Sequence, residues 1–359
     1  MAATVPYVPQ SLQASVNHPP TKITSVKALA ELPGLASIPT FYISNFASPH
    51  DHQIIFSDPD EDAIPVIDFS LLTSNGLDER FEIIQQLRKV CQDWGFFMVI
   101  NHGVPESLMK AIIDASKGFF ELTEDEKQEF EAKHVLDPIR CGTSFNVSAD
   151  KVLFWRNFLK VFVHPKFHSP SKPPSFSEIA LEYSKRVREV ARELVKGISE
   201  DRTLNLENGF QILVANFYPT CPQPELTIGV PLHTDHGLLT LLMQNEVGGL
   251  QVLHEGKWVT VDPIPNSFLV NVGDHIEILS NGKYKSLMHR ALVNNKATRI
   301  SIAVQHGPAL DEVVSPASEF VDNESNPPAY RAIKYQDYVE LQQSNTLDGK
   351  SFLENIRIY

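Results

Sequence analysis

The chain has 359 residues, 42% of them apolar, which is enough to bury a substantial core in one large domain or two ordinary ones. Its formal net charge of −13 argues against binding to nucleic acid or to anionic membranes and favours a solvated acidic surface. The three cysteines, Cys91, Cys141 and Cys221, lie far apart, which excludes a disulfide scaffold or a zinc knuckle and favours a reducing compartment.

No run of residues approaches the roughly 18 apolar residues that a membrane helix needs. The first residues carry neither the charged nor the apolar region of a secretory signal. We therefore expect a cytoplasmic protein.

Residues 1–62 are rich in proline, serine and small polar residues, and they are predicted to form an N-terminal arm rather than a domain. Within this arm, residues 38–43 are apolar and are expected to dock on the body of the protein.

Residues 63–204 alternate strand-like and helical patterns. Strands are expected at 64–69 and 96–100, and an amphipathic helix at 79–94, with Phe81 on its apolar face. A second helix should follow Pro105. Thr123 with Glu126 is a capping-box signature, and residues 175 and 178 repeat it before an amphipathic helix that reaches residue 198. This region is predicted to pack on a β-rich core.

The composition changes near residue 205, and short β-rich runs separated by turns follow as far as residue 310. Strands are expected at 212–218, 227–233, 238–243, 250–252, 258–261, 268–272, 275–279, 286–293 and 300–304. Asn281 and Gly282 form a strong two-residue hairpin signal. Many short strands indicate a sandwich or barrel. Residues 311–359, with a helix near 335–343, should fold back as a C-terminal cover.

Two side chains of the β-rich region, His233 and Asp235, are two residues apart. On a strand such residues point to the same face, so both can reach one metal ion. With His289 on a later strand they make the two-histidine, one-carboxylate set of a mononuclear non-haem iron(II) centre. Taken alone, His289 is better explained as a core histidine, and we expect that role for His236, His254, His275 and His306.

Arg299 and Ser301 show the same spacing on another strand. A guanidinium inside a barrel needs an anionic partner, which a carboxylate with a nearby hydroxyl can satisfy. An exposed Arg299, or one paired with a protein carboxylate, would not indicate an anionic ligand. Tyr218 is a further candidate donor, with a place in the barrel wall as the alternative.

These residues and several further motifs resemble the plant 2-oxoglutarate and iron(II)-dependent dioxygenases, the group of anthocyanidin and flavonol synthases, flavanone 3-hydroxylases, feruloyl-CoA hydroxylases and gibberellin oxidases. The resemblance covers about residues 38–356. The matching stretches are residues 64–68, 94–97, 100–104, 216–219, 233–235, 248–252, 271–274, 280–286, 289–290 and 299–301.

The resemblance implies a mostly β (α+β) fold with flanking helices around a double-stranded β-helix, or jelly-roll, catalytic core at 205–310. It implies His233, Asp235 and His289 as iron(II) ligands, and Arg299, Ser301, Tyr218 and Asn216 as contacts of 2-oxoglutarate. O2 is the second co-substrate, and ascorbate is the expected reductant. The expected reaction converts 2-oxoglutarate to succinate and CO2 while a small plant specialised metabolite or hormone is hydroxylated, desaturated or cyclised.

The substrate pocket is less well defined. Its wall is predicted from Cys141, Phe145, Asn146, Phe154, Phe158 and Gln305. Flavonoid-oxidising members carry an aromatic residue where this chain has Gln305, which weakens a flavonoid substrate relative to a terpenoid, coumarin precursor or hormone. The connection at 197–205 is also shorter than in relatives. The alternatives are a metabolite-binding protein without turnover and an ascorbate-dependent oxidase that needs no 2-oxoglutarate. A monomer is expected.

Overall fold

The computed structural model describes residues 25–44, 63–131, 134–143, 152–199, 206–322, 324–344 and 352–358. The strands in these ranges are β1 (Val66–Asp68), β2 (Phe96–Ile100), β3 (Ile139–Gly142), β4 (Asn157–His164), β5 (Gln211–Tyr218), β6 (Val230–His233), β7 (Leu239–Gln244), β8 (Leu250–His254), β9 (Lys257–Thr260), β10 (Phe268–Val272), β11 (His289–Ala291), β12 (Arg299–His306), β13 (Val313–Val314) and β14 (Ile333–Lys334). The helices are α1 (Val26–Ala30), α2 (Phe69–Leu72), α3 (Leu77–Asp93), α4 (Glu106–Glu121), α5 (Glu124–Lys127), α6 (Phe176–Ile198), α7 (Asp274–Leu279), α8 (Tyr335–Ser344) and α9 (Leu353–Ile356).

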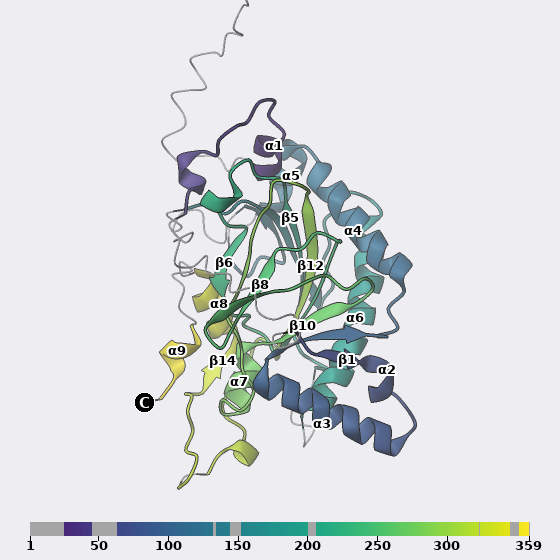
Figure 1. Cartoon of the computed structure of the whole chain (residues 1–359), viewed down its shortest axis with the longest axis vertical. Coiled ribbons are helices and arrows are strands. Elements are labelled where there is room, and N and C mark those ends of the chain that lie inside the picture. Colours follow the sequence, from purple (N-terminus) through teal and green to yellow (C-terminus); the bar gives the residue numbers. More distant parts are fainter. Residues whose placement is uncertain are drawn as a thin grey trace, which may run out of the picture.

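Two sheets form the centre of the molecule (Figure 1). The larger has eight strands in the order β1-β2-β10-β7-β12-β5-β4-β3, and the smaller has the order β6-β11-β8-β9. Side chains from both sheets line one cavity, so the sheets face each other as the two halves of a jelly roll. The large sheet takes β1 to β4 from before residue 204. The division of the chain at residue 204 therefore stays a prediction.

Strand β12 shows how the sequence separates the core from the cavity. Its apolar side chains pack into the main core, and these are Ile300, Ile302 and Val304. Its other side chains line the cavity, and these are Arg299, Ser301, Ala303 and Gln305. Because successive residues of a strand point to opposite faces, this alternating sequence builds a hydrophobic wall and a polar lining at once.

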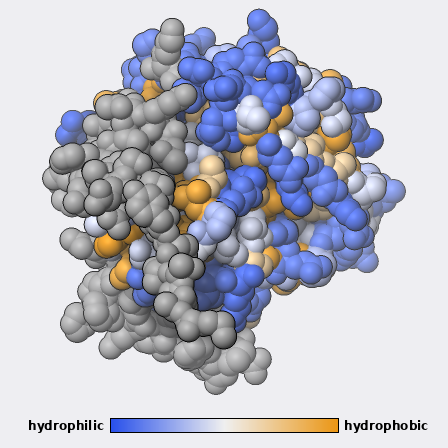
Figure 2. All heavy atoms as spheres, turned by 90° about the horizontal axis from the view of Figure 1, so that it is seen from above, coloured by the Kyte–Doolittle hydropathy of each residue, from blue (hydrophilic) through white to orange (hydrophobic). Residues whose placement is uncertain are grey.

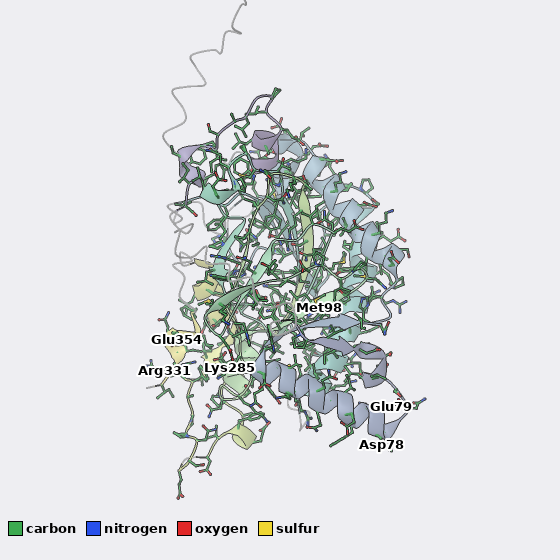
Figure 3. All side chains as sticks on the ribbon, in the orientation of Figure 1. Asp78, Glu79, Met98, Lys285, Arg331 and Glu354 are labelled. Atoms are coloured by element: carbon green, nitrogen blue, oxygen red, sulfur yellow. The ribbon has the colours of Figure 1, made fainter. Side chains whose placement is uncertain are left out.

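The outer face of the large sheet is covered by α4 and α6, with α3 packed against α6, and Figure 1 shows these helices along one side of the sheet. Each fully buried aliphatic or aromatic side chain at this contact contributes about 1.5–3 kcal/mol. Figure 3 shows Met98 within the sheet, and Asp78 and Glu79 at the outer end of α3. The two acidic residues lie in the first turn of α3, where they complement the helix dipole.

The apolar segment of the N-terminal arm docks as predicted. Ile38 and Tyr42 are buried in a cluster with Trp155, and the Tyr42 and Trp155 rings lie 5.1 Å apart, edge to face. Residues 1–24 and 45–62 of the predicted arm lie outside the described residues, as do residues 200–205 of the short connection.

The expected strand at 275–279 is wrong, because this segment is helix α7. The Asn281–Gly282 pair does not form a hairpin either. It ends α7 in a Schellman motif: the Gly282 amide donates to the Glu277 carbonyl over 2.8 Å, and the Asn281 amide donates to the Ile278 carbonyl over 3.0 Å. Both residues have positive φ, 51° and 83°. The same left-handed backbone serves a type I′ turn and a helix end, so the dipeptide alone does not distinguish them.

Smaller expectations have mixed outcomes. The capping box of Thr123 and Glu126 is confirmed, since each side chain accepts from the other residue's backbone amide. Ser175 makes no capping hydrogen bond at the start of α6, so the second capping box is wrong. Phe81 is 60% exposed rather than on the buried face of α3, where Ile83 and Leu87 lie.

Helix α8 confirms the helix expected near 335–343. On the face shown in Figure 2, hydrophilic residues dominate the outer parts of the described surface and hydrophobic ones gather near the middle of the view. Within the described ranges, every helix is too short or too polar to cross a bilayer.

Candidate active site

The two histidines and the carboxylate of the predicted iron centre come together in the structure. His233 ends β6 and is the cross-strand partner of His289 on β11, while Asp235 follows β6 by two residues. The Nε2 atoms of His233 and His289 lie 3.8 and 3.9 Å from Asp235 Oδ1. One ligand atom from each residue lies within 4.8 Å of the others, so these side chains can hold a single metal ion.

Each imidazole is oriented by a backbone carbonyl. His233 Nδ1 lies 2.8 Å from the Pro231 carbonyl oxygen, and His289 Nδ1 lies 3.2 Å from that of Leu287. Because a carbonyl only accepts, each Nδ1 carries the proton and each Nε2 keeps its lone pair. The histidines therefore present their free nitrogens toward Asp235, as metal-ligating histidines do.

Two amide side chains hold the Asp235 carboxylate. Asn271 Nδ2 donates to Oδ2 over 2.9 Å from β10, and Gln305 Nε2 donates to Oδ1 over 3.2 Å from β12. The carboxylate of the small-sheet side is thus anchored to the large sheet. Its orientation is set before any ligand arrives.

The ionisation states of this group suit metal binding. Burial, with a further contribution from His289, lowers the pKa of His233 to about 3. Burial raises the pKa of Asp235, but His289 and His233 outweigh it and bring this pKa down to about 2. At neutral pH His233 is therefore neutral and Asp235 is ionised, the forms that bind a cation.

The residues predicted to hold 2-oxoglutarate form a second patch in the same cavity. Arg299 and Ser301 on β12 are the cross-strand partners of Tyr218 and Asn216 on β5, and all four line the cavity. Their register places the guanidinium beside the phenol ring, with the Arg299 Cζ atom 4.9 Å from the Tyr218 ring centroid. Figure 1 shows β5 and β12 next to each other.

Arg299 is 1% exposed and holds unused hydrogen-bonding capacity. Its Nε and Nη2 atoms donate to Gln244 Oε1 over 2.9 and 2.6 Å. Its Nη1 atom is buried without a hydrogen-bond partner among the described residues. An unsatisfied buried donor on a charged group is costly, so this atom fits an anionic ligand oxygen inside the cavity.

Glycines allow the backbone to approach this patch. A Cβ atom at Gly229 would overlap the Tyr218 ring. Gly249 has a φ of 140°, and a Cβ there would lie 2.9 Å from the Leu292 carbonyl oxygen and 3.4 Å from Arg299 Cδ. Larger residues at these positions would displace the tyrosine and the arginine.

The cavity that contains both patches has about 1080 Å³ of empty space, counting its open mouth. Phe158 and Gln305 line it, as predicted for the substrate wall. Cys141 instead faces a separate small cavity, because it pairs with core residue Leu159 across β3 and β4 and its neighbour Arg140 takes the position that faces the main cavity. Phe154 is buried but does not line the main cavity. The predicted wall residues Phe145 and Asn146 lie outside the described residues.

Several lining residues were missed by the sequence analysis. They are Asn271, which holds Asp235, and three cations, Arg140, Arg156 and Lys160. Gln244, which holds Arg299 without lining the cavity, was missed as well. Asn271 lies in a stretch that matches the family, which was a usable signal. For the cations, the signal was a charged residue at an alternate position of an otherwise apolar strand.

Of the other histidines, His236, His275 and His306 are buried as expected, whereas His254 is only partly buried and lies outside the core. His275 and His306 are fully buried, and His254 stacks on Trp94 at 3.8 Å between ring centroids. His236 also lines the cavity, and its Nδ1 atom lies 2.9 Å from the Tyr335 hydroxyl of α8.

Comparison with known proteins agrees with this geometry. The sequence profile of the 2OG-Fe(II) oxygenase superfamily matches residues 209–308, and that of the N-terminal region of non-haem dioxygenases in morphine synthesis matches residues 64–179. The 2-oxoglutarate-dependent dioxygenase 19 of Oryza sativa subsp. japonica is 46% identical over 305 residues, 82% of this chain and 90% of that protein. Protein DMR6-LIKE OXYGENASE 2 of Arabidopsis thaliana is 40% identical, over 90% of this chain and 96% of its own.

A similar solved structure is the crystal structure of JOX2 in complex with 2OG, Fe and JA. It has a TM-score of 0.81 and 31% sequence identity, and the match covers 94% of this chain and 98% of that one.

Proposed function

The chain belongs to the 2OG-Fe(II) oxygenase superfamily, and on this premise we propose that it oxidises a small plant specialised metabolite or hormone at the His233–Asp235–His289 centre. The balanced reaction takes a substrate C–H bond, 2-oxoglutarate and O2 to the alcohol, succinate and CO2. Desaturation and ring closure are alternative outcomes of the same oxidation. The observation that carries the proposal is the meeting of a metal-ligand set and a buried, unsatisfied Arg299 donor in one cavity.

Each residue has a proposed role. His233, Asp235 and His289 hold iron(II), which supplies the oxygen-activating chemistry when bound. Arg299 Nη1 and the Ser301 hydroxyl bind the distal carboxylate of 2-oxoglutarate, and Tyr218 and Asn216 complete its contacts. The positive charge of Arg299 and the negative charge of this carboxylate thereby offset each other inside a buried site. The similar crystal structure of JOX2, which contains 2OG and Fe, supports both ligands.

The substrate lies between the two sheets, beside the metal ligands. Apolar side chains from both sheets, Phe96, Phe158, Val214, Leu242 and Leu250, line the cavity there. They exclude water and favour a substrate with an apolar body, since small-molecule sites are mostly apolar with a few placed polar groups.

Further parts of the proposal concern the setting of the enzyme. Ascorbate keeps the metal in the iron(II) state. The protein acts as a monomer in the cytoplasm, without a nucleic-acid or membrane partner. Cys91, Cys141 and Cys221 are free thiols rather than disulfides, which supports a reducing compartment.

The test is succinate formation by the full-length protein with iron(II), ascorbate and 2-oxoglutarate, together with a search of metabolite extracts for products heavier by one oxygen. We expect succinate and a matching product. Absence of succinate with every extract contradicts an oxygenase, and turnover without 2-oxoglutarate contradicts its role as co-substrate.

Variants assign the roles. His289→Ala should abolish turnover, whereas the matched control His254→Ala, on neighbouring strand β8 but outside the cavity, should keep it. Arg299→Gln should weaken 2-oxoglutarate binding about tenfold or more, because a charge-assisted hydrogen bond is worth about 1.5–3 kcal/mol. Unchanged 2-oxoglutarate affinity in Arg299→Gln would remove that residue from the site.

A further inference from the structure

His236 is a histidine of the cavity lining to which the proposed function gives no role. It follows Asp235 directly in the chain, lines the cavity and is 1% exposed. Its Nε2 atom is buried without a hydrogen-bond partner among the described residues. A buried polar atom in this state is costly, so its place in a ligand cavity points to a ligand that satisfies it.

The partner of the other ring nitrogen fixes which nitrogen of His236 carries the proton. Nδ1 lies 2.9 Å from the Tyr335 hydroxyl, which has no other hydrogen bond among the described residues. Tyr335 is 1% exposed and does not line the cavity, so its hydroxyl hydrogen is satisfied only by donation to Nδ1. The proton of the neutral imidazole then lies on Nε2, and a charged imidazole would carry one there as well. His236 therefore presents an N–H donor to the cavity.

This donor is held in place from two sides. Tyr335 of α8 binds its ring, and the His236 carbonyl accepts a hydrogen bond from His275 Nδ1 of α7. The rings of His275 and Tyr335 pack edge to face, with their centroids 4.7 Å apart. A group that is fixed before a ligand arrives loses little conformational entropy on binding, so a contact to it contributes efficiently to affinity.

Further polar groups belong to the same end of the cavity. The Gln305 amide and the charge of Lys160 both act on the His236 imidazole, although neither residue forms a hydrogen bond with Nε2. Lys160 Nζ makes one hydrogen bond among the described residues, to Gln343 Oε1 over 3.1 Å, so at least one of its N–H groups is left for a ligand. The Gln305 nitrogen donates to Asp235, which leaves the amide oxygen as an acceptor.

This end of the cavity is distinct from the 2-oxoglutarate patch. Gln305 lies six residues after Arg299 on β12, about 20 Å along the strand. Ser301 and Ala303 line the cavity between them. A ligand group beside His236 can therefore bind together with 2-oxoglutarate.

We propose that the His236 Nε2–H group recognises the substrate by donating to a carbonyl or hydroxyl oxygen at one end of an apolar molecule. Lys160 offers a second donor to a carbonyl oxygen, which has two lone pairs, and Gln305 offers an acceptor to the hydrogen of a hydroxyl. Tyr335 is a positioning residue, because it acts on the substrate through His236. This inference rests on the proposed function, since it names a feature of the substrate that binds at that site.

Nitrogen NMR of the full-length protein labelled with 15N-histidine, with zinc(II) in place of iron(II), tests the proton position. We expect a proton on Nε2 of His236, whose signals are identified by their loss in His236→Phe. Tyr335→Phe removes the donor to Nδ1 and should shift the population toward the other tautomer. Tyr183→Phe, which removes a buried hydroxyl without a partner among the described residues, should not shift it. A proton on Nδ1 and none on Nε2 in the wild-type protein overturns the proposal.

Variants test the contact with the substrate, using succinate formation stimulated by a rice leaf extract. His236→Phe keeps a ring but removes the donor, and it should raise the extract concentration for half-maximal stimulation about tenfold, the scale of one lost hydrogen bond to a buried group. It should lower 2-oxoglutarate affinity several times less. His236→Gln retains an N–H donor and should lose less than His236→Phe. The matched control His254→Phe lies outside the cavity and should leave this concentration unchanged.

Two outcomes of these variants overturn the proposal. One is an unchanged response in His236→Phe, and the other is an equal loss of extract response and 2-oxoglutarate affinity. Where His236→Phe does not fold, Tyr335→Phe is compared with Tyr183→Phe instead, and only the first should raise the half-maximal concentration. Equal responses of these two variants then overturn the proposal.

Chemical treatment of the extract identifies the oxygen. Borohydride reduction removes ketone and aldehyde carbonyls, and acetylation masks hydroxyls. Stimulation lost on reduction assigns a carbonyl, and stimulation lost on acetylation assigns a hydroxyl. Stimulation that survives both treatments, or none by the untreated extract, overturns the inference.

Direct binding of 2-oxoglutarate to the iron-loaded wild-type protein, measured by calorimetry under argon, distinguishes this inference from the proposed function. Failure of this binding counts against the proposed function. Intact binding together with an unchanged extract response in His236→Phe counts against the role of His236 alone.

Discussion

Gln305 has a more specific place than the general position in the substrate wall that the sequence analysis expected for it. Its amide reaches Asp235 Oδ1, the same oxygen that faces both histidine Nε2 atoms. The residue at this position therefore contacts the Asp235 carboxylate and also lines the cavity where a ligand would bind. Gln305 thus supports the candidate ligand set from the wall of the cavity.

Replacing Gln305 should weaken metal binding. Gln305→Leu keeps the volume but removes the donor to Asp235, and loss of such an outer partner lowers metal affinity about 10–100-fold. Titration of the metal-free protein with cobalt(II), followed by its visible absorption, measures the affinity. Gln343→Leu is the matched control, because Gln343 also lines the cavity but bonds Lys160. Equal cobalt affinity in Gln305→Leu and wild type would contradict this role.

Lys160 should make stability depend on pH. Burial and the charges of Arg140 and Arg156 lower its pKa from 10.5 to about 7, and His236 also interacts with its charge. Between pH 7 and 10.5 the unfolded chain holds a proton that the folded protein lacks, so this group makes stability rise with pH through that window. Below pH 7 the folded protein carries the full cost of a buried ammonium.

Lys160→Met should therefore stabilise the protein by about 2 kcal/mol at pH 6, the scale of removing an uncompensated buried charge. The gain should shrink as the pH approaches 10. Urea unfolding of both proteins at pH 6, 8 and 9.5 measures the difference. A gain that is constant across this range, or that grows with pH, would contradict a lowered Lys160 pKa.

At the scale of elements, helix α7 shows how a short segment is decided by its surroundings. The Asp274 carboxylate accepts from Thr234 over 3.1 Å, and Glu277 accepts from the Ser286 amide over 2.7 Å and from the Tyr330 hydroxyl over 2.7 Å. These partners lie on both sides of α7 along the chain, so a helix of six residues is held by bonds that its own sequence does not reveal.

The end of α7 should be sensitive to glycine replacement. Gly282→Ala should lower the free energy of unfolding by about 1 kcal/mol, because alanine disfavours a φ of 83° even where space is available. Gly248→Ala is the control: its φ is not positive, its Cβ would meet only ordinary contacts at 3.8 Å or more, and its effect should stay within about 0.5 kcal/mol. Urea denaturation compares the two variants, and equal losses would argue against the Schellman motif.

At the scale of the whole molecule, helix α8 contacts two separate segments of the β-rich region, the residues that follow β6 and the start of α7. Its Tyr335 and Tyr338 side chains bond His236 and Asp274, and Gln342 donates to the Thr234 carbonyl over 3.0 Å. Gln342 and Gln343 also line the cavity. The C-terminal segment therefore contributes to the site directly, besides packing on the sheets.

The hydrogen bond between Tyr338 and Asp274 should contribute to the stability of the packed α8. Tyr338 donates to Asp274 Oδ2 over 2.6 Å, while burial raises the pKa of Asp274 to about 7 and this bond opposes the rise. Tyr338→Phe should cost about 1–3 kcal/mol in unfolding free energy, because it leaves a buried carboxyl short of a donor. Tyr183→Phe removes a buried hydroxyl that has no partner among the described residues, and it should cost less. A smaller loss in Tyr338→Phe than in Tyr183→Phe would contradict this account.

The sequence by itself determined the features that depend on local spacing. Strand periodicity placed Arg299 with Ser301, and the alternation along β12 separated core from cavity. The two-residue spacing also brought His233 and Asp235 to one site, although Asp235 lies just beyond the end of β6. The matching motifs identified the family and with it the jelly roll.

Only the tertiary structure decided which distant residues meet. The helical form of α7, the amide support of Asp235 and the cation cluster of Lys160 all depend on the register between strands and on packing from far along the chain. The physical reason is that period and composition specify which face a side chain takes, whereas its partners across that face are set by sheet pairing.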